Sequence, residues 1–338
     1  MTYLVTGGGG FIGSHLVEAL VDRGDDAVVL DDFSTGQRDN LARAAESALL
    51  DLVEGSMLDL PLVASLMERA DVCIHLASAV GVKMIVQRPV ETLLTNVRGN
   101  DAVISTAAEH GVRLIFISTS EVYGKNSADS LREDADRLLG SPFKSRWAYA
   151  TAKAFGEALA NSYWVDRAAR MTVVRLFNTV GPRQSSAYGM VLPRFVQQAL
   201  RGEDVTVFGD GTQSRCFIHV ADTVAGILSL VEPTSSFGRA FNVGSDEQIT
   251  ISELAAKVIE RVGSASQIRF VPYEDAYGAG FEELGRRRPD TGAIESLTGW
   301  RRMRSLEETL DDVIAFERAR QAGDALAPSA SPAASRTG

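Results

Sequence analysis

A glycine-rich turn close to the start of the chain constrains the fold more than any other feature. The apolar run Tyr3–Thr6 predicts a buried strand, and Gly7-Gly8-Gly9-Gly10-Phe11-Ile12-Gly13 follows it directly, ahead of an amphipathic helical pattern. In this context Gly7 permits a tight turn, Gly10 lets the backbone approach a pyrophosphate, and Gly13 lets helix and strand pack closely. Phosphate groups bind well at a helix N-terminus. The start of the chain therefore predicts a dinucleotide site.

The order of apolar segments along the chain predicts the fold class. Short β-branched runs, which we expect to be buried strands, alternate with amphipathic helical patterns. These runs are Tyr3–Thr6, Ala27–Leu30, Val72–Leu76, Leu114–Ser118 and Met171–Leu176. Such alternation is typical of an α/β protein with a Rossmann-type doubly wound parallel sheet.

The alternation becomes less regular from about residue 180, where Gly, Pro and Asp turns separate shorter elements. We expect residues 1–180 to form a Rossmann domain that binds the dinucleotide. Residues 181–318 should form a smaller C-terminal α/β lobe that mainly binds substrate. Residues 321–338 are rich in Ala, Ser and Pro with hardly any large apolar side chain, and we expect a disordered tail there.

Composition and charge exclude several classes of protein. The chain has 338 residues, of which 45% are hydrophobic and 23% charged, as in ordinary soluble domains. Its net charge of −10 argues against nucleic acid as a partner, because phosphate backbones are held by surplus Lys and Arg. No stretch has the length of a membrane helix and no secretion signal is visible, so we expect a cytoplasmic protein. Cys73 and Cys216 stand in no metal-ligand spacing, and we expect no metal site.

A tyrosine and a lysine four residues apart form a candidate catalytic pair. Tyr149 and Lys153 share one face of a predicted helix, so the ammonium can act on the phenol. A free phenol has a pKa near 10 and is a poor base at neutral pH. Lys153 and a positively charged nicotinamide ring would both favour the phenolate, so we expect a lowered pKa for Tyr149.

Polar residues follow two other predicted strands. Thr119, Ser120 and Glu121 come after Leu114–Ser118, at the strand end where doubly wound folds bind ligands, and the Thr119 hydroxyl can hydrogen-bond the reacting oxygen. Asp31 follows the second strand, where a carboxylate can accept both hydroxyls of the adenosine ribose. A 2′-phosphate there would meet a like charge, which favours NAD over NADP.

Taken together and in this order, several motifs resemble the extended short-chain dehydrogenases/reductases. They are the glycine-rich start, His75-Leu76-Ala77-Ser78, Thr119-Ser120-Glu121-Val122-Tyr123-Gly124, Tyr149 with Lys153, and Arg175-Leu176-Phe177-Asn178-Thr179-Val180-Gly181-Pro182-Arg183. Within that class they resemble the NAD-dependent nucleotide-sugar epimerases, dehydratases and decarboxylases, over residues 1 to about 318. The resemblance implies an enzyme with a catalytic triad of Thr119, Tyr149 and Lys153.

The same resemblance implies ligand contacts and an assembly. A UDP-sugar should bind Thr119, Ser120 and Tyr149, with its diphosphate held by Asn178, Arg215 and Arg287, and Arg194 as a weaker candidate. NAD should contact Gly7, Gly10, Phe11, Ile12, Gly13, Asp31, Asp32, Ser56, Met57, Leu76, Ala77, Ser78, Tyr149 and Lys153. Ser56 stands where related enzymes often carry an Asp that binds adenine. The segments Val90–His110 and Tyr149–Arg167 should form a homodimer interface.

The reactions of this group each begin with oxidation at C4 of the sugar and then diverge. Related dTDP-glucose 4,6-dehydratases carry Asp-Glu after the Thr, where this chain has Ser120-Glu121, so dehydration is disfavoured. UDP-glucuronate decarboxylases also show Thr-Ser-Glu-Val-Tyr-Gly. The run Lys144–Ala148 resembles a group that includes UDP-glucuronate 4-epimerases and one decarboxylase domain. We therefore expect a UDP-glucuronate 4-epimerase, with UDP-glucose as another candidate substrate and UDP-glucuronate decarboxylation as the alternative reaction.

A protein of a different class, one that binds NAD without catalysis, would normally lack the tyrosine or the lysine. Both are present here together with Thr119. This disfavours the non-catalytic alternative.

Overall fold

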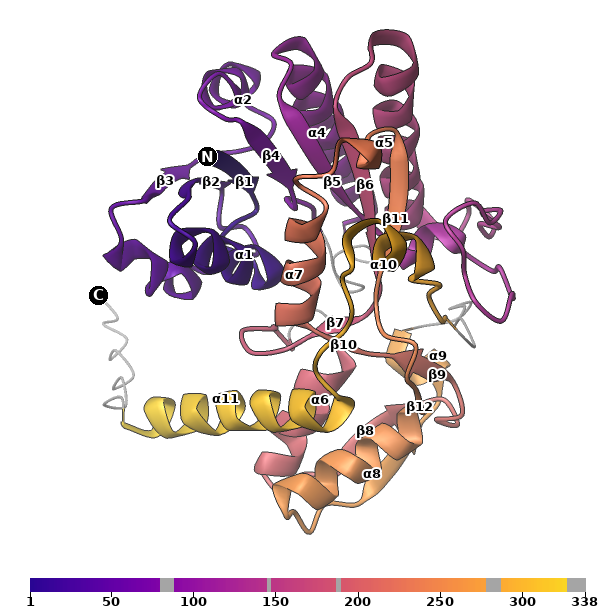
Figure 1. Cartoon of the computed structure of the whole chain (residues 1–338). Coiled ribbons are helices and arrows are strands. Elements are labelled where there is room, and N and C mark those ends of the chain that lie inside the picture. Colours follow the sequence, from indigo (N-terminus) through magenta and orange to yellow (C-terminus); the bar gives the residue numbers. More distant parts are fainter. Residues whose placement is uncertain (80–87, 145–146, 187–189, 278–286, 327–338) are drawn as a thin grey trace, which may run out of the picture.

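The computed structural model describes residues 1–79, 88–144, 147–186, 190–277 and 287–326. Within these ranges the chain builds a large parallel sheet with helices on both faces and, below it in Figure 1, a smaller lobe. Among the helices of the described part, none has the length and apolar character needed to cross a lipid bilayer.

The large sheet has seven strands, all parallel, in the order β11-β6-β5-β4-β1-β2-β3. The strands are β1 (Thr2–Thr6), β2 (Asp26–Asp31), β3 (Leu50–Glu54), β4 (Val72–His75), β5 (Arg113–Thr119), β6 (Met171–Leu176) and β11 (Arg239–Val243). The strand order changes direction between β1 and β4. In doubly wound sheets the ligand crevice opens at this switch point, beyond the carboxyl ends of the strands.

Helices cover both faces of this sheet and bury their apolar sides against it. Helices α1 (Phe11–Asp22) and α7 (Val220–Ser229) pack on one face through residues such as Leu16 and Ile227. The other face is covered by α2 (Leu60–Met67), α4 (Pro89–Glu109) and α5 (Trp147–Arg167). The smaller lobe, and neither of these two layers of helices, lies beyond the carboxyl ends of the strands (Figure 1).

The smaller lobe has its own apolar core and three short two-stranded sheets. β8 (Val205–Phe208) pairs in parallel with β13 (Ile268–Val271), β9 (Ser214–Cys216) pairs antiparallel with β12 (Gln248–Thr250), and β10 (Ile218–His219) pairs with β7 (Thr179–Val180). The remaining helices are α6 (Val191–Leu200), α8 (Ile251–Val262), α9 (Tyr273–Tyr277), α10 (Gly292–Thr298) and α11 (Leu306–Leu326). Leu192, Leu254 and Leu310 bring α6, α8 and α11 together in the core of this lobe.

Local sequence signals fix both ends of helix α8. Helix α8 begins with a capping box, in which Thr250 Oγ1 accepts the Glu253 N–H and the Glu253 carboxylate accepts the Thr250 N–H. It ends at Gly263, whose φ of +72° is the left-handed conformation that glycine adopts without strain.

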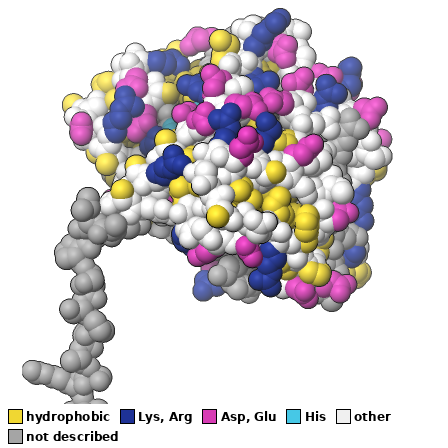
Figure 2. Space-filling view, turned by 90° about the horizontal axis from the view of Figure 1, so that it is seen from below, with side chains coloured by type: hydrophobic (Ala, Val, Ile, Leu, Met, Phe, Trp, Pro, Cys, Tyr) yellow, Lys and Arg dark blue, Asp and Glu magenta, His cyan; other side chains and the backbone are white. Residues whose placement is uncertain are grey.

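Acidic and basic side chains are interspersed over the lower face of the molecule (Figure 2). Lys257–Glu307 and Arg261–Asp311 ion pairs join α8 to α11.

The fold class predicted from the sequence is confirmed, and the five predicted strands are present with ends within two residues. Two strands of the large sheet were missed. β3 is largely exposed and lacks a buried apolar run, and β11 lies beyond residue 180 yet completes the large sheet beside β6. A division of the chain at residue 180 therefore does not separate the two lobes fully. Residues 321–326 belong to α11 and not to a disordered tail, and residues 327–338 lie outside the described part.

Candidate active site

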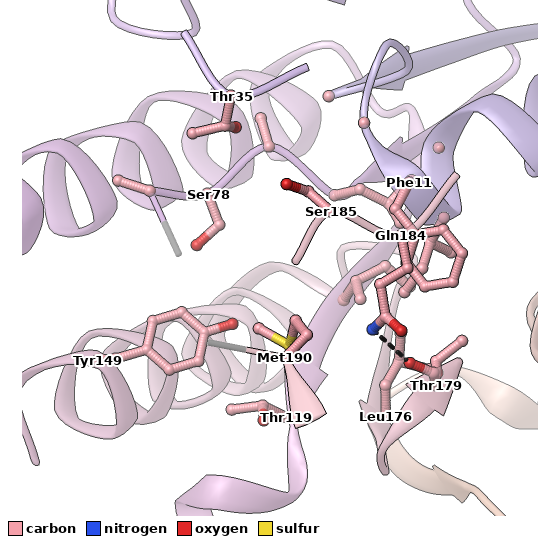
Figure 3. A pocket seen from close by; sticks show the side chains of 18 of the residues that line it. Phe11, Thr35, Ser78, Thr119, Tyr149, Leu176, Thr179, Gln184, Ser185 and Met190 are labelled. Carbon is pink, nitrogen blue, oxygen red and sulfur yellow. Dashed lines mark hydrogen bonds between the residues drawn. The ribbon is translucent and has the colours of Figure 1, made fainter. Parts of the chain in front are cut away.

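A cavity of about 450 Å³ opens at the carboxyl ends of the large sheet, between the two lobes. Its wall collects the segments that follow β1, β2, β4 and β5, the start of α5 and the segment after β6. In Figure 3, Tyr149 lies on one side of the cavity and Phe11 and Gln184 lie on the other. All but three of the predicted site residues line this cavity, the exceptions being Ser56, Arg194 and Arg215.

The glycine turn forms a cradle that larger residues would fill. Gly7 has a φ of +74°, and a Cβ at this position would lie 2.7 Å from the Ala77 nitrogen. A Cβ on Gly13 would collide with the Gly7 carbonyl oxygen. Gly10 precedes α1 and offers no side-chain cap, so N–H groups of the first turn can serve a phosphate. The turn therefore fits the pyrophosphate of a dinucleotide.

Asp31 is the acidic residue at the end of β2. Its Oδ2 accepts the Gly9 N–H and its Oδ1 accepts the Phe33 N–H, each at 2.8 Å. Burial raises the pKa of this carboxyl, while the two N–H donors act in the opposite direction. Each carboxylate oxygen retains a lone pair for a ribose hydroxyl. Ser56 does not reach the cavity, because its Oγ accepts the Leu58 N–H at 3.2 Å.

Tyr149 and Lys153 lie one turn apart on α5, as the spacing predicts. Lys153 is almost fully buried, and its Nζ donates to the Ile117 carbonyl at 2.9 Å. Burial lowers the pKa of Lys153 to about 8, although the Glu157 carboxylate opposes this shift. The lysine is therefore held against β5, the strand that carries Thr119.

The pKa of the Tyr149 phenol is raised, whereas the sequence predicted a lowered value. Burial is the main cause, and the Glu121 carboxylate adds to it, while a hydrogen bond with Ser78 acts in the opposite direction. Lys153 donates to a backbone carbonyl, and in the protein alone it does not offset the effects of burial and of Glu121 on this pKa. Any activation of Tyr149 as a base therefore depends on positive charge brought by a bound ligand.

Thr119 ends β5 and begins the short 3-10 helix Ser120–Tyr123. Its Oγ1 accepts the Glu121 N–H at 3.2 Å and so caps this helix, and its hydroxyl proton can still be donated into the cavity. The cap holds Ser120 and Glu121 beside the cavity.

Arg287 reaches the same corner of the cavity from the C-terminal part of the chain. It is 8% exposed, and its Nη1 lies 3.3 Å from Ser120 Oγ and 3.7 Å from Glu121 Oε1. The resemblance placed Arg287 at the diphosphate. The structure places its guanidinium beside Ser120 and Glu121, the two residues that follow Thr119.

The other predicted diphosphate residues are spread more widely. Asn178 lines the cavity and donates to the Cys216 carbonyl at 3.1 Å. Arg215 lies on β9, where its Nη1 donates to the Ser214 carbonyl at 2.7 Å. Arg194 packs away from the cavity, over the Phe208 ring at 4.0 Å, and donates to the Thr206 carbonyl. Neither Arg194 nor Arg215 is among the described residues that form the cavity wall.

Arg183 and Gln184 also line the cavity, although they were not predicted as site residues from the sequence. They follow the Gly181-Pro182 turn after β7, and such a turn at a strand end is itself a signal for a ligand-binding loop.

Comparison with known proteins agrees with this geometry. The model of the NAD dependent epimerase/dehydratase family matches residues 3–244, about seven tenths of the chain. The chain belongs to this family. UDP-N-acetyl-alpha-D-glucosaminuronate decarboxylase of Bacillus cytotoxicus is 36% identical over 316 residues, which cover 93% of this chain and 97% of that protein. UDP-glucuronic acid decarboxylase 1 of Danio rerio is 34% identical over 313 residues, covering 93% and 72%.

Among solved structures, UDP-glucuronic acid 4-epimerase from Bacillus cereus, in complex with UDP-glucuronic acid and NAD, superimposes with a TM-score of 0.85. It is 25% identical, and the match covers 95% of this chain and all of that one. The predicted family and the predicted cofactor NAD are confirmed. For the reaction, the sequence relatives support the decarboxylase alternative better than the epimerase that we expected first.

Proposed function

We propose that this member of the family is an NAD-dependent UDP-hexuronate decarboxylase, which converts a UDP-hexuronate to the corresponding UDP-pentose and CO₂. The buried Arg287 beside Ser120 and Glu121 carries the proposal, because a guanidinium at the reacting end of the cavity suits a sugar that bears a carboxylate. The names of the two sequence relatives support the same reaction, on UDP-glucuronate or its 2-acetamido analogue.

The first step is oxidation of the C4 hydroxyl. Tyr149 takes the hydroxyl proton, and Thr119 donates a hydrogen bond to the same oxygen. When bound, NAD supplies the acceptor of two electrons from C4 and later returns them. The positive charge of a bound oxidised cofactor would lower the pKa of Tyr149, which burial and the Glu121 carboxylate raise in the protein alone.

Loss of the carboxylate follows from the chemistry of the ketone. A carboxylate at C5 is β to a C4 ketone, so the bond between C5 and the carboxylate breaks, CO₂ leaves, and the electron pair stays on C5 and the C4 oxygen as an enolate. A proton added to C5 and reduction at C4 then give the UDP-pentose.

Arg287 and Glu121 act on that carboxylate in opposite ways. Arg287 binds it, and the Glu121 carboxylate, whose Oε1 lies 3.7 Å from Arg287 Nη1, repels it. This repulsion disappears when neutral CO₂ departs. Arg287 therefore holds the substrate, and Glu121 favours breakage of the bond between C5 and the carboxylate.

The role of Arg287 can be tested by comparing two ligands that differ at the carboxylate. In a Tyr149→Phe background, which prevents turnover, Arg287→Met should weaken UDP-glucuronate binding roughly 10- to 100-fold and UDP-glucose binding about twofold at most. Isothermal titration of the NAD-loaded variants gives both affinities. Equal losses for the two ligands would place Arg287 at the diphosphate and remove the main support for the proposal.

UDP-glucuronate 4-epimerisation is the second candidate, supported by the likeness to the Bacillus cereus structure. Both reactions share the oxidation step and the same base. They differ in the product, since an epimer keeps the mass of the substrate and a UDP-pentose does not.

We also propose a homodimer built on α4 and α5, which pack side by side on one face of the sheet. Large apolar side chains stay exposed on both helices: Val90 and Leu94 on α4, and Phe155 and Val165 on α5. Exposed apolar surface on neighbouring helices favours association with a second copy.

A further inference from the structure

Gln184 has a buried hydrogen-bond acceptor that no donor among the described residues reaches. The residue is 9% exposed and lines the cavity, and its Nε2 donates to the Thr179 carbonyl at 3.0 Å (Figure 3). This bond fixes the orientation of the amide, because the opposite orientation would bring two carbonyl oxygens together. Among the described residues, none donates to Gln184 Oε1. A buried acceptor in a ligand cavity that lacks a protein donor is suited to accept one from the ligand.

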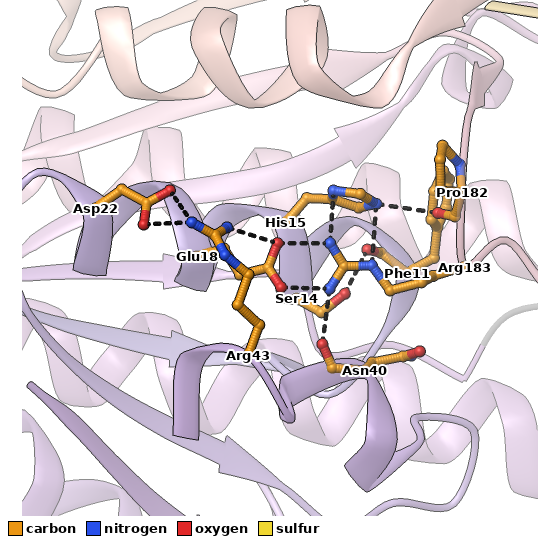
Figure 4. Close-up of polar contacts among 9 residues, drawn as sticks. All are labelled: Phe11, Ser14, His15, Glu18, Asp22, Asn40, Arg43, Pro182 and Arg183. Atoms are coloured by element: carbon orange, nitrogen blue, oxygen red, sulfur yellow. Dashed lines mark hydrogen bonds and ion pairs between the residues drawn. The ribbon is translucent and has the colours of Figure 1, made fainter. Parts of the chain in front are cut away.

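Arg183, the residue before Gln184, holds the Gln184 amide in place although its own backbone is strained. Arg183 has a φ of +70°, a conformation that residues other than glycine seldom adopt. Its guanidinium forms a bidentate ion pair with Glu18 of α1, with contacts of 3.0 and 2.7 Å, and donates to the Asn40 carbonyl at 2.7 Å (Figure 4). A further contact of 2.8 Å joins Arg183 Nη2 to His15 Nδ1.

These contacts tie the segment after β7 to the helix that begins at the glycine turn. His15 strengthens the tie through Nε2, which lies 3.0 Å from the Pro182 carbonyl oxygen. Arg183 and Glu18 are both about 15% exposed at their side chains, so water competes little for the pair. Gln184 is thus fixed relative to the start of α1, where the cofactor pyrophosphate binds.

The position of Gln184 indicates which ligand group it meets. A dinucleotide bound from Asp31 across the glycine turn toward Tyr149 would place its nicotinamide end between Phe11 and Tyr149, all of which line the cavity. Gln184 lies beside Phe11, on the side of the cavity opposite Tyr149 (Figure 3). The nicotinamide carboxamide carries an N–H donor at this end of the cofactor.

We propose that Gln184 Oε1 accepts a hydrogen bond from the carboxamide N–H of the nicotinamide, and that Arg183 is the positioning residue that holds Gln184 for this contact. The bond fixes the rotation of the ring and hence the face turned to the sugar. It is independent of the choice between decarboxylation and epimerisation, since both use the same cofactor.

The test compares NAD with 3-acetylpyridine adenine dinucleotide, in which a methyl group replaces the amide nitrogen. Isothermal titration of the nucleotide-free full chain gives the affinity for each. The wild type should bind the analogue roughly five- to tenfold more weakly than NAD. In Gln184→Met the two affinities should agree within about twofold, because the acceptor that distinguishes them is gone.

Gln267→Met is the matched control, since Gln267 is an exposed amide remote from the cavity, and it should keep the wild-type ratio. Gln184→Leu repeats the test with a different shape, and thermal melting verifies that each variant is folded. An unchanged ratio in the folded Gln184 variants would overturn the proposal. So would a loss confined to the affinity for UDP-glucuronate, which would assign Oε1 to a sugar hydroxyl.

Discussion

Tyr149 is the residue on which the proposed first step of the reaction depends. Replacing Tyr149 with Phe removes the phenol that we propose accepts the C4 proton, and leaves the ring and its packing. Activity should fall about 10²–10⁴-fold, the usual contribution of a general base. NAD binding and the melting temperature should change little. Steady-state kinetics with calorimetric NAD titration measure both, and a variant with near-wild-type activity would refute the assignment of the base.

Lys153 should lower the stability of the fold at neutral pH. Its pKa in the folded chain is about 8, below the ordinary value of 10.5, because burial disfavours the ammonium. The unfolded chain therefore binds more protons between about pH 8 and pH 10, so stability should rise with pH in that window. Lys153→Met should stabilise the protein at pH 7 by about 1–3 kcal/mol while abolishing activity, and should remove this rise.

Urea unfolding at pH 7 and pH 9.5 measures the effect of Lys153. Lys257→Met is the control, since Lys257 is an exposed lysine paired with Glu307, and its effect should stay within about 0.5 kcal/mol. A Lys153→Met variant that is less stable than the wild type at pH 7 would contradict the expected cost of burial.

At the scale of elements, Arg183 links the segment after β7 to α1. Arg183→Gly loses the ion pair with Glu18 but adopts the positive φ without strain, whereas Arg183→Ala loses the pair and keeps the strain. The glycine variant should be the more stable of the two by about 1 kcal/mol. Both should bind NAD more weakly than the wild type. Arg43→Gln, which removes an exposed arginine that also contacts Glu18, should leave NAD affinity unchanged.

If the alanine variant were as stable as the glycine variant, the left-handed backbone at Arg183 would carry no strain. If both variants bound NAD as tightly as the wild type, the link to α1 would have no part in placing the cofactor site. Thermal melting and NAD titration of the three variants distinguish these outcomes.

Elements with a strong periodic pattern could be predicted from the sequence, and elements defined by long-range pairing could not. β1, β2, β4, β5 and β6 are buried on both faces and appear as apolar runs. β3 is largely exposed, so its pairing with β2 leaves little trace in the sequence. β11 pairs with β6 although it follows β6 by more than 60 residues in the chain, and only the folded topology reveals this pairing.

The residues of the candidate site divide in the same way, into those that local spacing predicts and those that only the fold brings together. Gly7, Asp31, Thr119, Tyr149 and Lys153 belong to motifs with fixed local spacing, and the structure brings them to one cavity. Arg287 contacts Ser120 across 167 positions, so its neighbours could not be derived from spacing. The raised pKa of Tyr149 could not be predicted from the sequence either, since burial and the distance to Glu121 are properties of the folded chain.

At the scale of the whole molecule, the exposed apolar side chains of α4 and α5 predict a dimer. Light scattering coupled to size exclusion should give twice the mass of the chain. Leu94→Arg places a charge on that surface, where Leu94 is 40% exposed, and should shift the equilibrium toward monomer without loss of folded structure. A wild-type protein that is monomeric at micromolar concentration would refute the dimer.

The mass of the product distinguishes the proposed removal of CO₂ from a UDP-hexuronate from epimerisation. Purified enzyme is incubated with UDP-glucuronate and, separately, with its 2-acetamido analogue, without added reductant, and the products are identified by mass spectrometry and NMR. We expect a UDP-pentose, lighter than the substrate by CO₂, with no net reduction of NAD. A C4 epimer of unchanged mass from both substrates would contradict it.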